Sequence, residues 1–431
     1  MKPALNSDER VSSSHSTAGG LAVSSAPRDT GAKSRIADTM RRWCLQTLGV
    51  RLKAVVLTGS LARNEATWQP TGDAISFLSD AEFVVIVDDK EEIPSPALIM
   101  LITKGAEEEL RNYGVLCKLS FAAVHESFLL DLDETIFGYE LLSCGEVVYG
   151  DPAILRSKAG LATRINQEDA WRMLANRTVE LLEIVPEFVN GPDRLSEAAQ
   201  YRLTKLYCDM ATSVLAFKQQ FTPGYQARAG KLCDLHTRSR LSDLPFDGDW
   251  FVDMVRRCTG YKVGLGWQGD SPVASPHSVR VAVAALRSLW TWELAQMHAT
   301  EMTSPETMLK LHMQKQKLQD RLRGWAFVVR RRGMLDSLRH GWRWLRLSRL
   351  ASPRYCVYAA ALHAVSRFEF QVSSTANPAG LSRLETRNLK LGAMLNWLPI
   401  PNLSVRTVPD EKDIAEAILW NYREFLVETR A

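Results

Sequence analysis

Two short stretches of the sequence carry residue types that can bind a phosphate ligand together with a metal ion. Gly59 and Ser60 follow the apolar run 52–58. Glycine permits a close approach to the backbone, and a serine hydroxyl can donate to a phosphate oxygen. Asp80 and Glu82 begin a second apolar run. Side chains two residues apart on a strand project from one face, so this pair can hold Mg²⁺ against a triphosphate.

Each of these parts also has an ordinary structural explanation. A Gly-Ser pair after a strand is usually only a turn, and an Asp-x-Glu at a strand start is usually a solvated edge. The charge run 88–92 (Asp-Asp-Lys-Glu-Glu) is interpreted as such a solvated segment. The order and proximity of the Gly-Ser turn and the carboxylate pair favour a ligand site.

Alternating apolar runs and helical segments must position these residues. We expect strands at 52–58, 81–87, 115–124 and 146–149, and helices at 36–48, 95–112 and 134–143. This alternation is typical of a sheet domain, and the pattern becomes helical after residue 153. The predicted organisation is a disordered tail (1–35), a sheet domain (36–152), a helical bundle (153–265), a linker (266–278) and a second helical region (279–431).

The net charge of +4 conceals an acidic segment followed by a basic one. Residues 36–150 carry 9 basic and 18 acidic groups, whereas residues 151–431 carry 39 basic and 28 acidic groups. The 431 residues contain seven scattered cysteines and no apolar run of about 18 residues, which excludes a disulfide scaffold and a membrane span. The predicted location is cytoplasmic, or peripheral at a membrane.

The segment Gly59-Ser60-Leu-Ala-Arg63-Asn-Glu65, followed by Ser79-Asp80-Ala-Glu82, resembles the nucleotidyltransferase superfamily of DNA polymerase beta type. It is most similar to the bacterial aminoglycoside-adenylyltransferase and stand-alone nucleotidyltransferase branches. Residues 146–152 resemble the segment that closes the catalytic domain of that family. Residues 201–207 and 225–228 resemble the helical region behind it. The resemblance covers about residues 36–235 and leaves 236–431 unassigned.

The resemblance implies an α+β fold, in which a small mixed-sheet nucleotidyltransferase domain precedes a mostly α-helical C-terminal region. It further implies that Asp80 and Glu82 are catalytic metal ligands for Mg²⁺ or Mn²⁺. The nucleoside triphosphate is then bound by five residues, namely Gly59, Ser60, Arg63, Lys205 and Arg228. For Lys205 and Arg228, a surface charge on a helix is an equally good explanation.

The activity implied by the resemblance is transfer of a nucleoside monophosphate, AMP above all, to a hydroxyl group. The acceptor is a small molecule, a saccharide or a protein, and pyrophosphate leaves. Metal bridging and electrostatic stabilisation supply most of the acceleration in such a reaction. The alternative is a protein of the same fold that binds nucleotide as a scaffold or regulator and has impaired catalysis.

Two departures from the family pattern bear on this choice. Nineteen residues separate Ser60 from Asp80, and we expect the insert 66–79 to form a loop over the site. The family often has a third carboxylate on the next strand, where this sequence has Ser120. Serine is a poor base at neutral pH, so Glu126, or alternatively His125, is the predicted substitute.

Residues 315–354 carry twelve Lys or Arg and only two Asp. An apolar stripe recurs there at helical spacing, formed by Val328, Leu335, Leu338, Trp342 and Leu345. Packing of this stripe in the core, with a solvated basic face, is one interpretation. Binding to an anionic membrane surface or an acidic partner is another. Because the whole chain is near neutral, a dedicated nucleic-acid binder is disfavoured.

Overall fold

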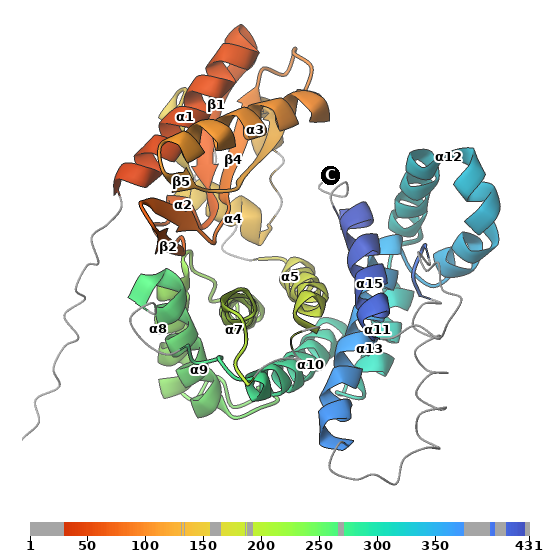
Figure 1. Cartoon of the computed structure of the whole chain (residues 1–431). Helices are drawn as coiled ribbons and strands as arrows, with labels where there is room; N and C mark the ends of the chain where they lie inside the picture. Colours follow the sequence, from red (N-terminus) through yellow and green to blue (C-terminus); the bar gives the residue numbers. More distant parts are fainter. Residues whose placement is uncertain are drawn as a thin grey trace, which may run out of the picture.

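The computed structural model has a mixed α+β architecture, with a small sheet region followed by a helical region (Figure 1). It describes residues 30–426 except 131, 133, 156–164, 186, 188–192, 266–270, 375–396 and 401–410. Most of the predicted tail (1–35) lies outside the described residues, but its last residues belong to helix α1 (Thr30–Leu48). The predicted boundaries at 152, 265 and 278 stay predictions.

The central sheet has four strands in the order β6-β4-β1-β7. Strand β1 pairs antiparallel with both β4 and β7, whereas β4 and β6 run parallel. The strands are β1 (Leu52–Thr58), β4 (Ala81–Val87), β6 (Leu119–His125) and β7 (Glu146–Tyr149). Three of them agree with the expected runs, because continuous apolar segments of this length form strands that are buried on both faces. The expected strand 115–124 is instead divided, since only β6 belongs to this sheet and residues 115–116 form a short strand of a second sheet.

Helices cover both faces of this sheet, which explains its continuous apolar strands. Alternate residues such as Val55 and Val85 pack against helices α1 and α3 (Pro96–Asn112). Val56 and Val84, on the other face, pack with Leu141 of helix α4 (Ile136–Cys144). Figure 1 shows α1 and α3 lying over the sheet. The ends of β1 and β4 are thereby fixed in one rigid layer.

The insert between the two chemical motifs is a β-hairpin, so the predicted loop over the site is wrong. Strands β2 (Trp68–Thr71) and β3 (Ala74–Phe77) pair antiparallel, and β3 also pairs parallel with β5 (Val115–Leu116). Gly72, which has a positive φ of 60°, occupies the tight turn between β2 and β3. After the hairpin, the chain reaches Ser79, which lies two residues before the start of β4.

The C-terminal region is a helical assembly around one large apolar core. Its elements are α5 (Gln167–Glu180), α7 (Glu197–Phe217), α8 (Tyr225–Thr237), α9 (Gly248–Gly260), η5 (Tyr261–Leu265), α10 (Pro276–His298), α11 (Pro305–Lys315), α12 (Leu318–Ser348), α13 (Pro353–Ser374) and α15 (Glu411–Leu426). Ser196 and Ser304 cap α7 and α11 through their side chains, as their positions before the helices predict. None of the helices in the described ranges is long and apolar enough to cross a bilayer.

Helix α12 buries only the start of the predicted apolar stripe, since Val328 is buried and the later members are exposed. The backbone leaves helical geometry at Gly333, where φ is 76° and ψ is −178°. Trp325 and Trp344 face inward on either side of this break, and their indoles donate to the carbonyls of Ala351 and Pro399. Packing of the stripe in the core is therefore wrong for its second half. Three of its apolar side chains are almost fully exposed, namely Leu335, Leu338 and Trp342.

Candidate functional site

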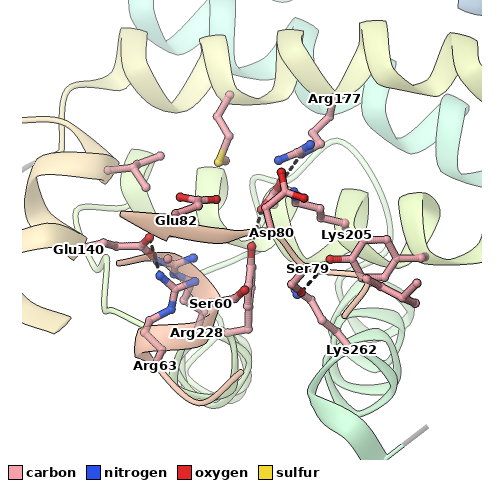
Figure 2. A pocket seen from close by; sticks show the side chains of 17 residues that line it. Ser60, Arg63, Ser79, Asp80, Glu82, Glu140, Arg177, Lys205, Arg228 and Lys262 are labelled. Carbon is pink, nitrogen blue, oxygen red and sulfur yellow. Dashed lines mark hydrogen bonds and ion pairs between the residues drawn. The ribbon is translucent and has the colours of Figure 1, made fainter. Parts of the chain in front are cut away.

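A cavity of about 220 Å³ lies where the sheet region meets the helical region. Figure 2 shows its walls. The sheet region contributes Ser60 and the carboxylates of Asp80 and Glu82, and the helices contribute Lys205 and Lys262. Seven of the eight sequence-predicted site residues line this one cavity, namely Gly59, Ser60, Arg63, Asp80, Glu82, Lys205 and Arg228.

The acidic wall is formed where β1 ends and β4 begins. Thr58 pairs with Glu82 across the two antiparallel strands, which places Gly59 against the Glu82 side chain. A Cβ at Gly59 would lie 3.0 Å from Oε2 of Glu82, and the residue has a positive φ of 70°. Only glycine meets both conditions without strain. The Gly-Ser turn thus makes room for the carboxylate.

Neither carboxylate of this wall is neutralised inside the cavity. The side-chain carboxylate of Glu82 has no hydrogen bond or ion pair with the rest of the described chain. Asp80 has one ion pair at 3.5 Å with Lys118, whose side chain is 74% exposed, and exposed pairs of this kind contribute little. Ser79 anchors the segment, since its hydroxyl accepts from the Thr67 amide and hydrogen-bonds with the Tyr201 hydroxyl. The backbone segment that carries the carboxylates is thus anchored, and both carboxylates remain available to a cation.

The opposite wall carries two lysines without a carboxylate partner among the described residues, Lys205 on α7 and Lys262 in η5. Lys262 is only 1% exposed, and its Nζ lies 5.0 Å from the ring centre of Tyr225 and 5.4 Å from that of Tyr201. The Thr67 hydroxyl donates to its backbone carbonyl and ties η5 to the sheet region. A buried ammonium without a carboxylate is costly, unless a ligand brings the negative charge.

The pKa of Tyr201, which lies beside these lysines, reflects their positive potential. Burial by itself raises the pKa of Tyr201, but the ammonium groups of Lys262 and Lys205, helped by hydrogen bonds, outweigh it. The net result is a pKa below the usual value of the phenol. The helical wall therefore stabilises negative charge within the cavity.

Arg63 and Arg228 lie on the cavity wall in a buried ion-pair cluster. Both guanidinium groups bind the carboxylate of Glu140 from α4, and Arg63 also donates to Glu65. Arg228 donates in addition to the Thr212 hydroxyl, so most of its donors are engaged within the protein. Burial alone would lower the pKa of Arg63, but Glu140 and Glu65 raise it above the usual value. The cluster fixes α2 (Gly59–Ala62) and α4 against α8.

Replacing Glu140 with glutamine is expected to destabilise the protein by about 3 kcal/mol, because two buried guanidinium groups then lose their shared carboxylate. Urea unfolding measures this change. Glu146→Gln is the matched control, since Glu146 pairs with Lys33 while half exposed and its loss should change stability by less than about 1 kcal/mol. Equal effects of the two substitutions would contradict a structural role for the cluster.

A second ion-pair group closes the cavity from the helical side. Arg177 of α5 binds Asp209 of α7 and Glu180. Burial by itself would lower the pKa of Arg177, but these two carboxylates raise it well above the usual value. Asp209, which is 3% exposed, also accepts from the Tyr225 hydroxyl. Arg177 is thus fully paired, with two carboxylates for one guanidinium group, and the group links α5 to α7.

Glu126, the predicted base, is placed at the other end of the sheet. Strand β6 runs parallel to β4, with Ser120 beside Glu82 and His125 beside Val87. Glu126 follows His125, which is about 20 Å along the strand direction from the carboxylate pair. Neither residue lines the cavity. The interpretation of Ser120 as the residue beside the carboxylates is confirmed by the strand register.

Several cavity residues were missed from the sequence. Asp209 could have been recognised, because it is the one charged residue in the stretch 206–217 of α7. Glu140 and Arg177 lie on helices with ordinary charge patterns, so nothing in the sequence marked them as cavity residues. Lys262 lies in a kinked turn, where Gly264 has a φ of 95°, and its place follows only from the packing of η5 on the sheet region.

No family model and no curated protein matches this chain. Among solved structures, it is distantly similar to a spectinomycin adenyltransferase from Enterococcus faecialis, solved with ATP and spectinomycin. The match covers 59% of this chain and 98% of that one, at 11% identity and a TM-score of 0.34. A likeness of this size carries no weight for function, so the residues of the cavity must support any proposal.

Proposed function

We propose that this cavity binds a nucleoside triphosphate with Mg²⁺ and that the protein transfers the nucleoside monophosphate, AMP above all, to a hydroxyl acceptor. The supporting observation is the division of unbalanced charge. Asp80 and Glu82 face the cavity from one wall, and Lys205 and Lys262 face it from the other. A triphosphate with a divalent cation is complementary to this arrangement, because the cation can bind the carboxylates while the phosphates face the lysines.

The residues of the acidic wall fit Mg²⁺ but no closed metal site. In the described part of the chain, no group of three or more His, Cys, Asp or Glu could hold a metal ion. Mg²⁺ is usually held by one or two carboxylates together with substrate phosphates and water, which suits Asp80 and Glu82. When bound, the ion supplies Lewis-acid stabilisation of the charge that develops on the phosphate oxygens. Mn²⁺ has the same preference for oxygen ligands.

The lysines and the Gly-Ser turn would position the phosphates. Among the described residues, Lys262 and Lys205 are the cavity cations that lie outside the two ion-pair groups, whose arginines are all paired with carboxylates. They would neutralise the phosphate oxygens and the departing pyrophosphate, which is electrostatic stabilisation of the transition state. Ser60 adds a hydroxyl donor beside the carboxylates. Arg63 and Arg228 act through Glu140 as positioning residues in this proposal.

A second candidate is nucleotide binding without turnover. Ser120 is the residue beside Glu82 on β6, and serine does not abstract a proton at neutral pH. The carboxylates of Glu140 and Asp209, which also reach the cavity, are held by arginines. This arrangement favours slow transfer or a nucleotide-dependent scaffold. Both candidates require the same Mg²⁺–nucleotide site.

One experiment tests both candidates. ATP affinity is measured by calorimetry with and without Mg²⁺, and pyrophosphate release is measured with a panel of hydroxyl acceptors. Mg²⁺-dependent binding with pyrophosphate release supports transfer, whereas Mg²⁺-dependent binding without release supports the scaffold. Absence of nucleotide binding under both conditions would overturn the proposed site. The other three nucleoside triphosphates are tested in parallel to define base preference.

The exposed face of α12 supports membrane-surface binding as an additional property of this protein. Leu335, Leu338 and Trp342 are 84%, 78% and 84% exposed on the second half of the helix. Arg339 is exposed on the same half, and Arg349 is exposed directly after the end of the helix. An apolar stripe with a tryptophan and flanking arginines suits an anionic bilayer surface. This observation favours the membrane over a solvated basic face.

The double variant Leu338→Ser/Trp342→Ser is expected to lower binding to phosphatidylglycerol-containing vesicles by about tenfold or more, because two apolar side chains no longer enter the interface. Vesicle flotation measures the bound fraction. Met100→Ser/Leu101→Ser on α3 is the control, since these residues are also exposed and lie elsewhere. Equal vesicle binding by the unmodified protein, the α12 double variant and the α3 control would contradict the proposal. So would a protein that does not bind vesicles but self-associates, if the α12 double variant abolished the self-association.

A further inference from the structure

A second and larger cavity, of about 750 Å³, lies inside the helical region and shares no lining residue with the first. It opens to solvent on one side and is lined by α5, the end of α10, α11, the first half of α12 and the start of α13, with Phe425 of α15 at one edge. The proposed nucleotidyl transfer makes no use of it. We propose that this cavity binds a small anionic molecule, a phosphate or a carboxylate with a planar apolar body.

The inner wall of the cavity is apolar and aromatic. Phe327 and Tyr355 line it, and Tyr355 is backed by the buried indole of Trp171 at a ring distance of 5.4 Å and an angle of 27°. Trp171 is stacked in turn on Trp290, with ring centres 5.2 Å apart. A wall of stacked rings that is fixed from behind favours a flat ligand, which can lie against it without loss of freedom in the protein.

The rim of the cavity is cationic. Lys315, Lys317 and Arg323 are exposed there and have no carboxylate partner among the described residues. Two acidic residues, Glu168 and Asp320, also line the cavity, against five cationic ones in all. Three cations without a carboxylate partner at the edge of an apolar cleft attract an anion. Their positive charge is the reason for proposing a negatively charged ligand.

The back of the cavity holds polar atoms that the protein leaves without partners. His312 is 5% exposed, and its Nδ1 lies 3.1 Å from Nε2 of His298. Its Nε2 lies 3.4 Å from Oε2 of Glu168, yet neither this Nε2 nor Oε1 of Glu168 has a hydrogen-bond partner in the described chain. Buried polar atoms are normally hydrogen-bonded. These two atoms lie behind the cavity surface, so they add polarity to its wall and do not contact a ligand directly.

Calorimetry with 1-naphthyl phosphate tests this proposal, because the probe combines a planar apolar body with one phosphate. We expect binding at least about tenfold tighter than that of inorganic phosphate or 1-naphthol alone. The double variant Lys315→Glu/Arg323→Glu should weaken binding by about tenfold or more, since charged hydrogen bonds are lost. The control Lys310→Glu/Arg330→Glu reverses exposed charges on the same two helices outside the cavity and should leave affinity unchanged.

Two further measurements distinguish binding in this cavity from binding at the proposed nucleotide site. The variant Lys262→Met should bind 1-naphthyl phosphate as the unmodified protein does, because Lys262 lines only the first cavity. Displacement of the probe by AMP would support a nucleotide as the natural planar anion, and undisturbed binding would support a non-nucleotide one. Probe affinity equal to that of inorganic phosphate, or unchanged by the charge-reversal double variant, would overturn the proposal whatever the first cavity binds.

Discussion

Replacing Asp80 with alanine is expected to lower Mg²⁺-dependent pyrophosphate release by about a thousandfold, because a lost metal ligand removes several kcal/mol of transition-state stabilisation. The expectation follows from the unneutralised state of the carboxylate. Asp80 opens to the cavity beside Glu82, and its single ion-pair partner, Lys118, is solvent-exposed. A carboxylate whose role was structural would be paired within the protein, as Glu140 is.

The nucleotide affinity of the Asp80→Ala variant provides a readout that does not depend on turnover. The unmodified protein should bind ATP more tightly with Mg²⁺ than without it, and the variant should lose this difference. Asp73→Ala is the matched control, since Asp73 is exposed at the tip of the β2–β3 hairpin and outside the cavity. If Asp80→Ala retained the Mg²⁺ effect on ATP binding, the carboxylates would not be the metal site.

The sheet and one wall of the site were predictable because local sequence patterns determine them. The strands around Gly59 and Asp80 are continuous apolar runs, and their order along the chain fixes which ends meet. The Gly59-Ser60 turn is then placed beside the Glu82 side chain through the antiparallel register of β1 and β4. The sequence indicated these residues without knowledge of any tertiary contact.

The opposite wall was not predictable in the same way. Glu126 failed as a base because the parallel register of β6 carries it away from Glu82, and strand direction is not visible in a local pattern. The Thr67 hydroxyl donates a hydrogen bond to the backbone carbonyl of Lys262. This bond joins two segments that are 195 residues apart in the sequence and holds Lys262 at the cavity. Long-range placement of this kind depends on how the helical region packs on the sheet. Unbalanced buried charge is therefore evident only in the folded chain.

Replacing Lys262 with methionine is expected to weaken ATP binding by about a hundredfold while raising the free energy of unfolding by about 1 kcal/mol. The two effects have one cause. An ammonium group that is 1% exposed and lacks a carboxylate partner in the described chain is compensated only in part by the neighbouring tyrosine rings, so it destabilises the protein until phosphate is bound. Methionine has a similar volume and no charge, so it removes the desolvation cost together with the phosphate contact.

Calorimetry with Mg²⁺–ATP and urea unfolding measure these two opposed changes on one variant. The pKa of Tyr201 gives a third readout, since Lys262 lowers it, and the phenol should titrate at higher pH in Lys262→Met. Lys231→Met on α8 is the control, because Lys231 lies outside the cavity and should alter none of the three. A structural role for Lys262 would instead lower stability and leave ATP affinity unchanged. Opposite signs for stability and affinity are expected only if the lysine is buried for the sake of an anionic ligand.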